Sequence, residues 1–165
     1  VLSAGKIVTG QYEMWLPSDN VLNRGTGFLF PTDATTLTIP SSASRAISVG
    51  AYDARRFVYA DFSGRGFTRL MNLVKPDLVA PGVEVMTAAA GGGYAAFTGT
   101  SFATPFVTGS AALLMEWGIV RGNDPYLYGE KVKAYLRRGA KELPGFGEYP
   151  NEEVGYGEDV IIRLH

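Results

Sequence analysis

Cysteine is absent from this 165-residue chain, and histidine occurs once, as the last residue, His165. The absence of cysteine excludes a disulfide framework, a thiolate nucleophile and any cysteine-ligated zinc or iron–sulfur centre. A single terminal histidine excludes a multi-histidine metal site and leaves the interior of the chain without an imidazole base. Because chain ends are usually mobile, we expect His165 to be a frayed terminal residue rather than a catalytic group.

Strong net charge and long apolar runs are also lacking. The chain has 15 Lys and Arg against 16 Asp and Glu, a formal net charge of −1. The basic surface of a nucleic-acid-binding protein is therefore missing. No run of about 18 or more apolar residues is found, so we expect neither nucleic acid nor a membrane as a partner.

The composition, 46% hydrophobic and 19% charged, fits one globular domain or a large part of one. The chain begins at Val1 without a signal-peptide pattern, and we expect it to be a piece of a longer protein.

The first 40 residues differ in pattern from the rest of the chain. Residues 6–16 alternate between apolar and polar side chains, which predicts a half-exposed strand, and residues 35–39 form a short β-branched run. After Pro40, residues 46–52 and 78–80 are apolar nearly throughout, as strands of a parallel sheet covered on both faces are. The predicted fold class is therefore α/β, preceded by β-rich structure.

Two helices are predicted to cover the parallel sheet. Residues 102–120 hold almost no polar face before Glu116, which indicates a helix in the middle of the core. Gly109 inside this helix predicts that another backbone packs closely against it.

The second predicted helix is announced by a capping residue and a proline in residues 123–125, Asn-Asp-Pro, and runs from Pro125 to about Arg138. We expect Val132 to lie on its apolar face and Lys133 to face water.

The most informative segment is residues 91–105, GGGYAAFTGTSFATP, where a glycine-rich loop and a short strand lead into a helix. Ser101 in the first helical turn would have its hydroxyl beside unpaired N–H groups and the positive end of the helix dipole, which suits oxyanion stabilisation. The simplest alternative is that Ser101 or Thr100 caps the helix. A phosphate-binding loop does not fit, because five residues rather than four separate Gly93 from Gly99 and threonine replaces the lysine.

Residues 99–109 match the pattern G-T-S-x-A-x-P-x-V-x-G and closely resemble the nucleophile motif of subtilisin-like serine proteases. Three upstream segments resemble further blocks of this family in the family's order: residues 46–51 (AISVGA), 62–66 (FSGRG) and 75–82 (KPDLVAPG). Residues 154–157 (VGYG) are similar to its closing G-x-G segment. The resemblance extends over most of the chain.

The resemblance implies a subtilisin-like parallel sheet with covering helices and a serine endopeptidase that acts on polypeptide substrates. It implies that Ser101 is the nucleophile that forms the acyl-enzyme and that its backbone N–H binds the oxyanion. Gly99 and Thr100 would lie beside the scissile bond as substrate-binding residues.

The family's aspartate and histidine blocks and its oxyanion asparagine have no match in this sequence. Asp33 lies in Thr-Asp-Ala, outside the aspartate motif. A serine hydroxyl without a base is a weak nucleophile. We therefore expect the upstream half of a parent protease to supply the base and the isolated chain to be inactive.

Residues 1–40 are similar to the end of the β-rich, jelly-roll insertion of a group of bacterial subtilases that includes spore-germination proteases. Residues 41–165 would be the C-terminal part of the catalytic domain. No cofactor is expected. The family often binds structural calcium, but the acidic residues near the end of the chain lack a ligand pattern and no metal site is assigned: Glu152, Glu153, Glu158 and Asp159.

Two alternatives stay open. The first is a catalytically dead subtilase-like module that binds a partner or a substrate peptide, and the second is a folding fragment with no function of its own. A truncated core would expose hydrophobic surface, so we also expect the chain to self-associate.

Overall fold

The computed structural model describes residues 5, 10, 12–17, 19–68 and 73–160, which belong to two compact units, 1–32 and 33–165. Each unit is described by itself. The sequence predicts a different division, with residues 1–40 as the end of a jelly-roll-like insertion and residues 41–165 as part of the catalytic domain. Both assignments stay predictions.

The amino-terminal unit holds one short 3₁₀ helix, Asp19–Val21, among its described residues. The strand predicted over residues 6–16 is wrong where it can be compared, because residues 10 and 12–16 are not in a strand. The remainder of that range lies outside the described residues. Tyr12 and Trp15 are 76% and 60% exposed, so the apolar face that a half-buried strand would pack is not buried here.

The carboxy-terminal unit is built on a three-stranded sheet with the order β2–β1–β3. β1 (Val49–Asp53) pairs in parallel with β3 (Leu78–Pro81) and antiparallel with the short β2 (Val58–Tyr59). Ala51 of β1 lies opposite Ala80 of β3, and both are fully buried. The two apolar runs therefore form the parallel pair that the sequence predicts.

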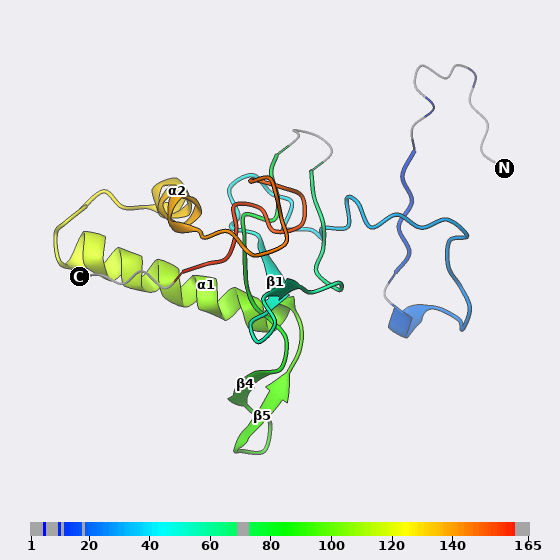
Figure 1. The fold of residues 1–165 in the computed structure, drawn as a ribbon, viewed down its shortest axis with the longest axis horizontal. Helices are drawn as coiled ribbons and strands as arrows, with labels where there is room; N and C mark the ends of the chain where they lie inside the picture. Colours follow the sequence, from blue (N-terminus) through cyan, green and yellow to red (C-terminus); the bar gives the residue numbers. More distant parts are fainter. Residues whose placement is uncertain (1–4, 6–9, 11, 18, 69–72, 161–165) are drawn as a thin grey trace. The chain divides into compact units, whose positions relative to one another are not determined.

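A second sheet is the hairpin of β4 (Val85–Ala88) and β5 (Tyr94–Phe97), which projects from the rest of this unit (Figure 1). The free edge of β3 is covered by the chain end, because Val79 N–H donates to the Gly157 carbonyl and Asp159 N–H donates to the Val79 carbonyl. The segment predicted as a strand over residues 35–39 is not one.

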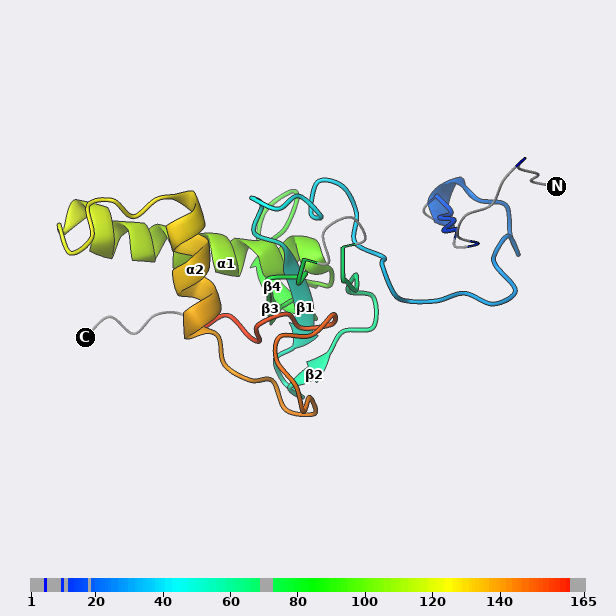
Figure 2. The ribbon, with the colours of Figure 1, turned by 90° about the horizontal axis from the view of Figure 1, so that it is seen from above.

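One helix packs on the sheet and a second helix packs on the first. α1 (Thr100–Met115) continues into a π-helical segment, η2 (Glu116–Val120), and α2 (Gly129–Gly139) crosses α1 (Figure 2). α1 buries Ala103, Val107 and Leu114 in the main core, which it shares with β1 and β3.

α1 is less buried than the sequence predicts. Phe106, Leu113 and Met115 are 36%, 43% and 42% exposed, and a β-carbon at Gly109 would meet no described atom within 4 Å. The expectation of a backbone packed against Gly109 is therefore wrong for this structure. α1 carries apolar side chains on all its faces, but the rest of the unit buries only one of these faces.

The helix Thr100–Val120 differs from the expectation that no segment is long and apolar enough to span a membrane, while the expectation that a membrane is not a partner stays a prediction. Its 21 residues are long and apolar enough to cross a membrane by length and composition. The central helix of a soluble protein can have the same composition, and in this structure one face of the helix lies in the core with β1 and β3.

α2 begins four residues later than predicted, with Tyr128 in extended conformation at its N-cap. The preceding residues form a turn in which Leu127, 1% exposed, packs beside Gly118 and donates its N–H to the Asp124 carbonyl. Because this turn buries Leu127, residues 125–128 are not helical and α2 starts at Gly129 instead of Pro125.

Lys133 is buried, which corrects the expectation that it faces water. Its ammonium donates to the carbonyls of Ser44 and Ala46 at 2.6 and 3.0 Å, and lies 3.3 Å from a carboxylate oxygen of Asp77. Burial lowers its pKa, and the neighbouring cations Lys75 and Arg137 lower it further, while Asp77 acts in the opposite direction.

Asp77, fully buried just before β3, has hydrogen-bond partners in three separate parts of this unit. One carboxylate oxygen accepts hydrogen bonds from the Ser48 N–H at 2.6 Å and the Lys75 ammonium at 2.7 Å. The other accepts from the guanidinium of Arg137 on α2. Burial alone would raise its pKa, but these donors and cations hold the pKa below its usual range.

We expect Asp77→Asn to lower the free energy of unfolding by about 3–5 kcal/mol, because it leaves three buried or half-buried cations without their carboxylate. Urea denaturation measures this change. Glu116→Gln is the matched control, since Glu116 pairs with Arg121 at 2.9 Å where both side chains are about half exposed or more; it should change stability by no more than about 0.5 kcal/mol. A loss below about 1 kcal/mol for Asp77→Asn would contradict the prediction.

Stability should depend on pH with opposite signs at two carboxyls. The Asp77 pKa is lowered by folding, so its stabilisation is present above the ordinary carboxyl pKa and is lost as pH falls through the folded value. Burial raises the Asp159 pKa, only partly offset by the 2.6 Å hydrogen bond from Ser110, so its contribution decreases as pH rises from the ordinary to the folded value.

The measurement is the free energy of unfolding of the wild type, Asp77→Asn and Asp159→Asn from about pH 3 to 7. The stability that the wild type holds over Asp77→Asn should increase with pH, and the corresponding difference for Asp159→Asn should decrease. Parallel trends for the two variants would show that the assigned signs are wrong.

Candidate active site

Ser101 lies in the first turn of α1, which begins at Thr100 with Gly99 as its N-cap. No side chain caps this end of the helix, so the capping role considered for Ser101 or Thr100 is not observed. Ser101 is exposed. The N–H groups of Thr100 and Ser101 belong to the first helical turn, where backbone donors have no intrahelical acceptor.

Gly99 has φ 151° and ψ 159°, a backbone conformation that is essentially restricted to glycine. The chain enters α1 directly from this residue, and the Phe102 N–H donates to its carbonyl at 3.0 Å. A β-carbon at Gly99 would have space, since its nearest neighbour would be the Phe102 ring at 3.7 Å. The requirement for glycine is therefore the backbone angle, which sets the sharp turn before Ser101.

The turn lies just outside the carboxyl ends of the two parallel strands. Gly82 directly follows β3, and its carbonyl accepts a 2.8 Å hydrogen bond from the Gly99 N–H. Gly82 in turn donates its N–H to the carbonyl of Tyr52 in β1. In open α/β sheets this edge is where ligands bind, so the fold brings Ser101 to the place where chemistry is expected.

Two aromatic rings flank the serine turn. Phe97 at the end of β5 stacks on Phe102, with 5.3 Å between ring centroids and planes 15° apart. Thr98 ties the same turn to the base of the hairpin, because its hydroxyl accepts the Glu84 N–H at 3.0 Å.

Pro105 lies inside α1, four residues after Ser101. A proline has no N–H, so the Ser101 carbonyl has no donor from the next helical turn. The Thr104 hydroxyl donates to the carbonyl of the preceding residue, Thr100, at 3.0 Å.

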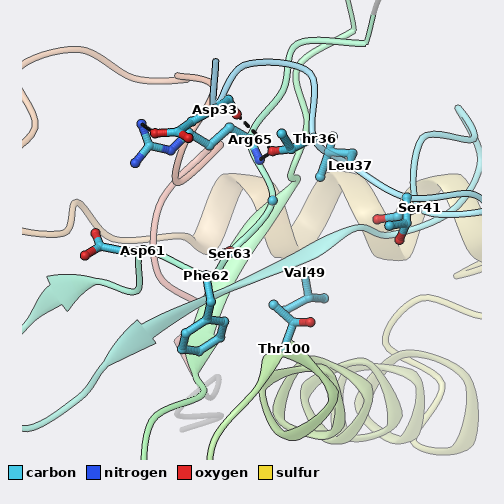
Figure 3. Close-up of a pocket in the computed structure, with 12 residues that line it drawn as sticks. Asp33, Thr36, Leu37, Ser41, Val49, Asp61, Phe62, Ser63, Arg65 and Thr100 are labelled. Carbon is cyan, nitrogen blue, oxygen red and sulfur yellow. Dashed lines mark hydrogen bonds and ion pairs between the residues drawn. The ribbon is translucent and has the colours of Figure 1, made fainter. Parts of the chain in front are cut away.

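A cavity of about 350 Å³ opens beside Thr100. Figure 3 shows Thr100 next to Val49 at one side of this cavity, with Arg65 and Asp33 farther along its lining. The lining is mixed in character, with apolar, hydroxyl and charged side chains: Asp33, Thr36, Leu37, Thr38, Ser41, Val49, Asp61, Phe62, Ser63, Gly64, Arg65 and Thr100.

Arg65 organises the charged end of the cavity. Its guanidinium lies 2.9 Å from the Glu153 carboxylate and 3.8 Å from that of Asp33, and it stacks over the ring of Tyr59 at 5.3 Å. Asp33 is therefore an ion-pair partner of Arg65 in the cavity lining, and Figure 3 shows it at the side of the cavity away from Thr100. Sequence reasoning did not identify Arg65 or Val49 as cavity residues, although both lie in segments that resemble family blocks.

The acidic residues of the closing segment have structural partners. Glu153 binds Arg65, and Asp159 accepts a hydrogen bond from Ser110 on the buried face of α1. Among the residues that are described, no group of three or more His, Cys, Asp or Glu side chains is placed to hold a metal ion. The expected absence of an assignable calcium site stays a prediction, and His165 lies outside the described residues.

Comparison with known proteins gives relatives that are proteases. The chain is 35% identical over 106 residues to the alkaline elastase YaB of Bacillus sp. strain YaB, covering 63% of this chain and 24% of that protein. It is 31% identical over 127 residues to the serine protease AprX of Bacillus subtilis, covering 65% and 27%. The chain thus spans about a quarter of the length of these relatives.

Solved structures give the same result. The CspB protease of Clostridium perfringens superposes with a TM-score of 0.80 and 46% sequence identity, covering 85% of this chain and 30% of that one. The prenylagaramide maturation protease PagA superposes with a TM-score of 0.64 and 32% identity, covering 78% and 44%. The subtilisin-like α/β fold predicted from the sequence is confirmed by these neighbours.

Residues 20–157 match the subtilase family of peptidases, the S8 peptidases. This range contains both parallel strands, the hairpin, both helices and the turn that carries Ser101. Taken with the superposition on solved proteases, the match shows that this chain belongs to the subtilase family.

Proposed function

We propose that the chain is the part of a subtilisin-type serine endopeptidase that carries the nucleophile, Ser101. The observation that supports this most directly is the exposed serine in the first turn of α1, after a glycine-only backbone conformation and outside the carboxyl ends of two parallel strands. Residues 41–165 would be the C-terminal part of the catalytic domain, and residues 1–40 would be the end of a β-rich insertion.

In the proposed reaction the Ser101 hydroxyl attacks the carbonyl carbon of a peptide bond in a polypeptide substrate. The hydroxyl proton passes to a base and then to the leaving amine, and the acyl group stays on Ser101 until water hydrolyses the ester. The Ser101 N–H, unpaired within the helix, is directed at the oxyanion. Gly99 and Thr100 contact the substrate beside the scissile bond, and Thr100 also lines the adjoining cavity.

The base is the component that we assign to the upstream half of the parent protease. The chain's one histidine is His165, and Asp33 is engaged with Arg65. The proposal therefore includes two statements about partners: the chain acts together with upstream polypeptide, and by itself it is inactive.

A fluorophosphonate probe tests the function. We expect labelling of the chain mixed with the upstream half to exceed labelling of the chain alone by more than about 10³-fold, because a base is needed to activate the hydroxyl. Ser101→Ala should abolish the labelling, and Ser42→Ala, the control that removes another hydroxyl, should not change it. A folded mixture that is not labelled would favour a catalytically dead module that binds peptides or partners.

The exposed side of α1 leads to a prediction about association. Phe106 and Leu113 of α1, seven residues apart, are 36% and 43% exposed, and Ile119 of the following π-helical segment is 42% exposed. Apolar side chains that gather on one helix face are often covered by protein. We expect the chain alone to self-associate in sedimentation velocity experiments and Leu113→Glu to shift the distribution toward monomer. Strictly monomeric wild-type chain at all concentrations would contradict this expectation.

A further inference from the structure

Gly82 lies where three parts of the site meet. It follows β3 directly, its carbonyl accepts the Gly99 N–H at 2.8 Å, and its N–H donates to the Tyr52 carbonyl in β1 at 3.0 Å. These two hydrogen bonds connect the serine turn to the central parallel pair of strands.

The space around Gly82 admits no side chain. A β-carbon at this position would lie 2.6 Å from the Ala51 β-carbon, 3.1 Å from the Gly99 carbonyl oxygen and 3.4 Å from the Ala103 β-carbon. The first distance is shorter than real contacts allow, and the second is tight against backbone. Gly82 is outside the left-handed region, so the requirement for glycine here is one of space and not of backbone angle.

We propose that Gly82 is a positioning residue for the nucleophile, because the absence of a side chain at residue 82 lets the serine turn pack directly against the end of β3. A methyl group at residue 82 would push the Gly99 carbonyl away from β3 and move the following Thr100 and Ser101 with it. Displacements of a fraction of an ångström to about 1 Å at a nucleophile cost up to about 10²-fold in rate. This inference rests on the proposed function of Ser101.

The other supports of the turn come from α1 and from the hairpin. Pro105 provides no N–H for the Ser101 carbonyl, so the helix does not hold this residue through its usual backbone bond. The stacked pair of Phe97 and Phe102 supports the turn from the hairpin side, and that hairpin projects from the unit (Figure 1). Gly82 adds a direct backbone link between this turn and the sheet, through its bonds to Gly99 and Tyr52.

The test compares three variants in the assembled protease that contains this chain. Gly82→Ala introduces the methyl group, and the double variant Ala51→Gly with Gly82→Ala transfers a methyl group from β1 to residue 82, which keeps the buried volume and removes the 2.6 Å overlap. The contact with the Gly99 carbonyl persists in both. Gly129→Ala is the control, because a β-carbon there would meet no described atom within 4 Å.

The readouts are resistance to urea and the saturable kinetics of fluorophosphonate labelling. We expect Gly82→Ala to lower the maximum labelling rate by about tenfold or more while the half-saturating probe concentration stays unchanged. The double variant should regain resistance to urea and keep the low rate. Gly129→Ala should match the wild type in both respects.

Recovery of the labelling rate together with stability in the double variant would overturn the proposal, because a purely structural role predicts that result. A folded Gly82→Ala variant that reacts at the wild-type rate would overturn it as well.

Hydrogen exchange of the Gly99 amide separates this inference from the proposed function. Exchange should be at least about tenfold faster in Gly82→Ala, because the bond from Gly99 to the residue 82 carbonyl is strained open. If the wild-type protease is not labelled, the proposed function fails, and the exchange rate still decides whether Gly82 holds the turn. Unchanged exchange would overturn the positioning role.

Discussion

The buried carboxylate of Asp77 is the interaction on which the rest of the carboxy-terminal unit depends. It binds the backbone before β1 through Ser48, the residue two positions before it through Lys75, and α2 through Arg137. β3 begins at the next residue, so the same anchor fixes the start of the strand whose far end contacts the serine turn. The hydrogen bonds and ion pairs of Asp77 thus fix the start of β3, and the residue that follows the end of β3, Gly82, binds the serine turn.

The sequence was most informative where a local pattern determines a local structure. The apolar runs around Ala51 and Ala80 predicted the parallel pair, and residues 99–109 predicted a helix with serine in its first turn. Lys133 could not be placed in the same way, because its burial depends on carbonyl oxygens about 90 residues away in sequence and on the charge of Asp77. A lysine at a helical position gives no local sign of such partners.

Two other differences have the same origin in tertiary packing. α2 starts late because Leu127 is drawn into the core beside Gly118, which outweighs the helix-starting preference of Pro125. The alternating segment near Tyr12 has the period of a strand, yet a strand forms only when a neighbour completes its hydrogen bonds, and periodicity does not say whether the neighbour is present. The cavity beside Thr100 likewise combines residues from separate segments that no single motif joins.

Pro105 leaves the Ser101 carbonyl without its usual helical donor. The helix is nevertheless held beyond the proline, because Val107 and Leu114 are 3% and 2% exposed in the core shared with β1 and β3, and Ser110 donates to Asp159. The Ser101 carbonyl can therefore accept a hydrogen bond from outside the helix without any helical bond being broken.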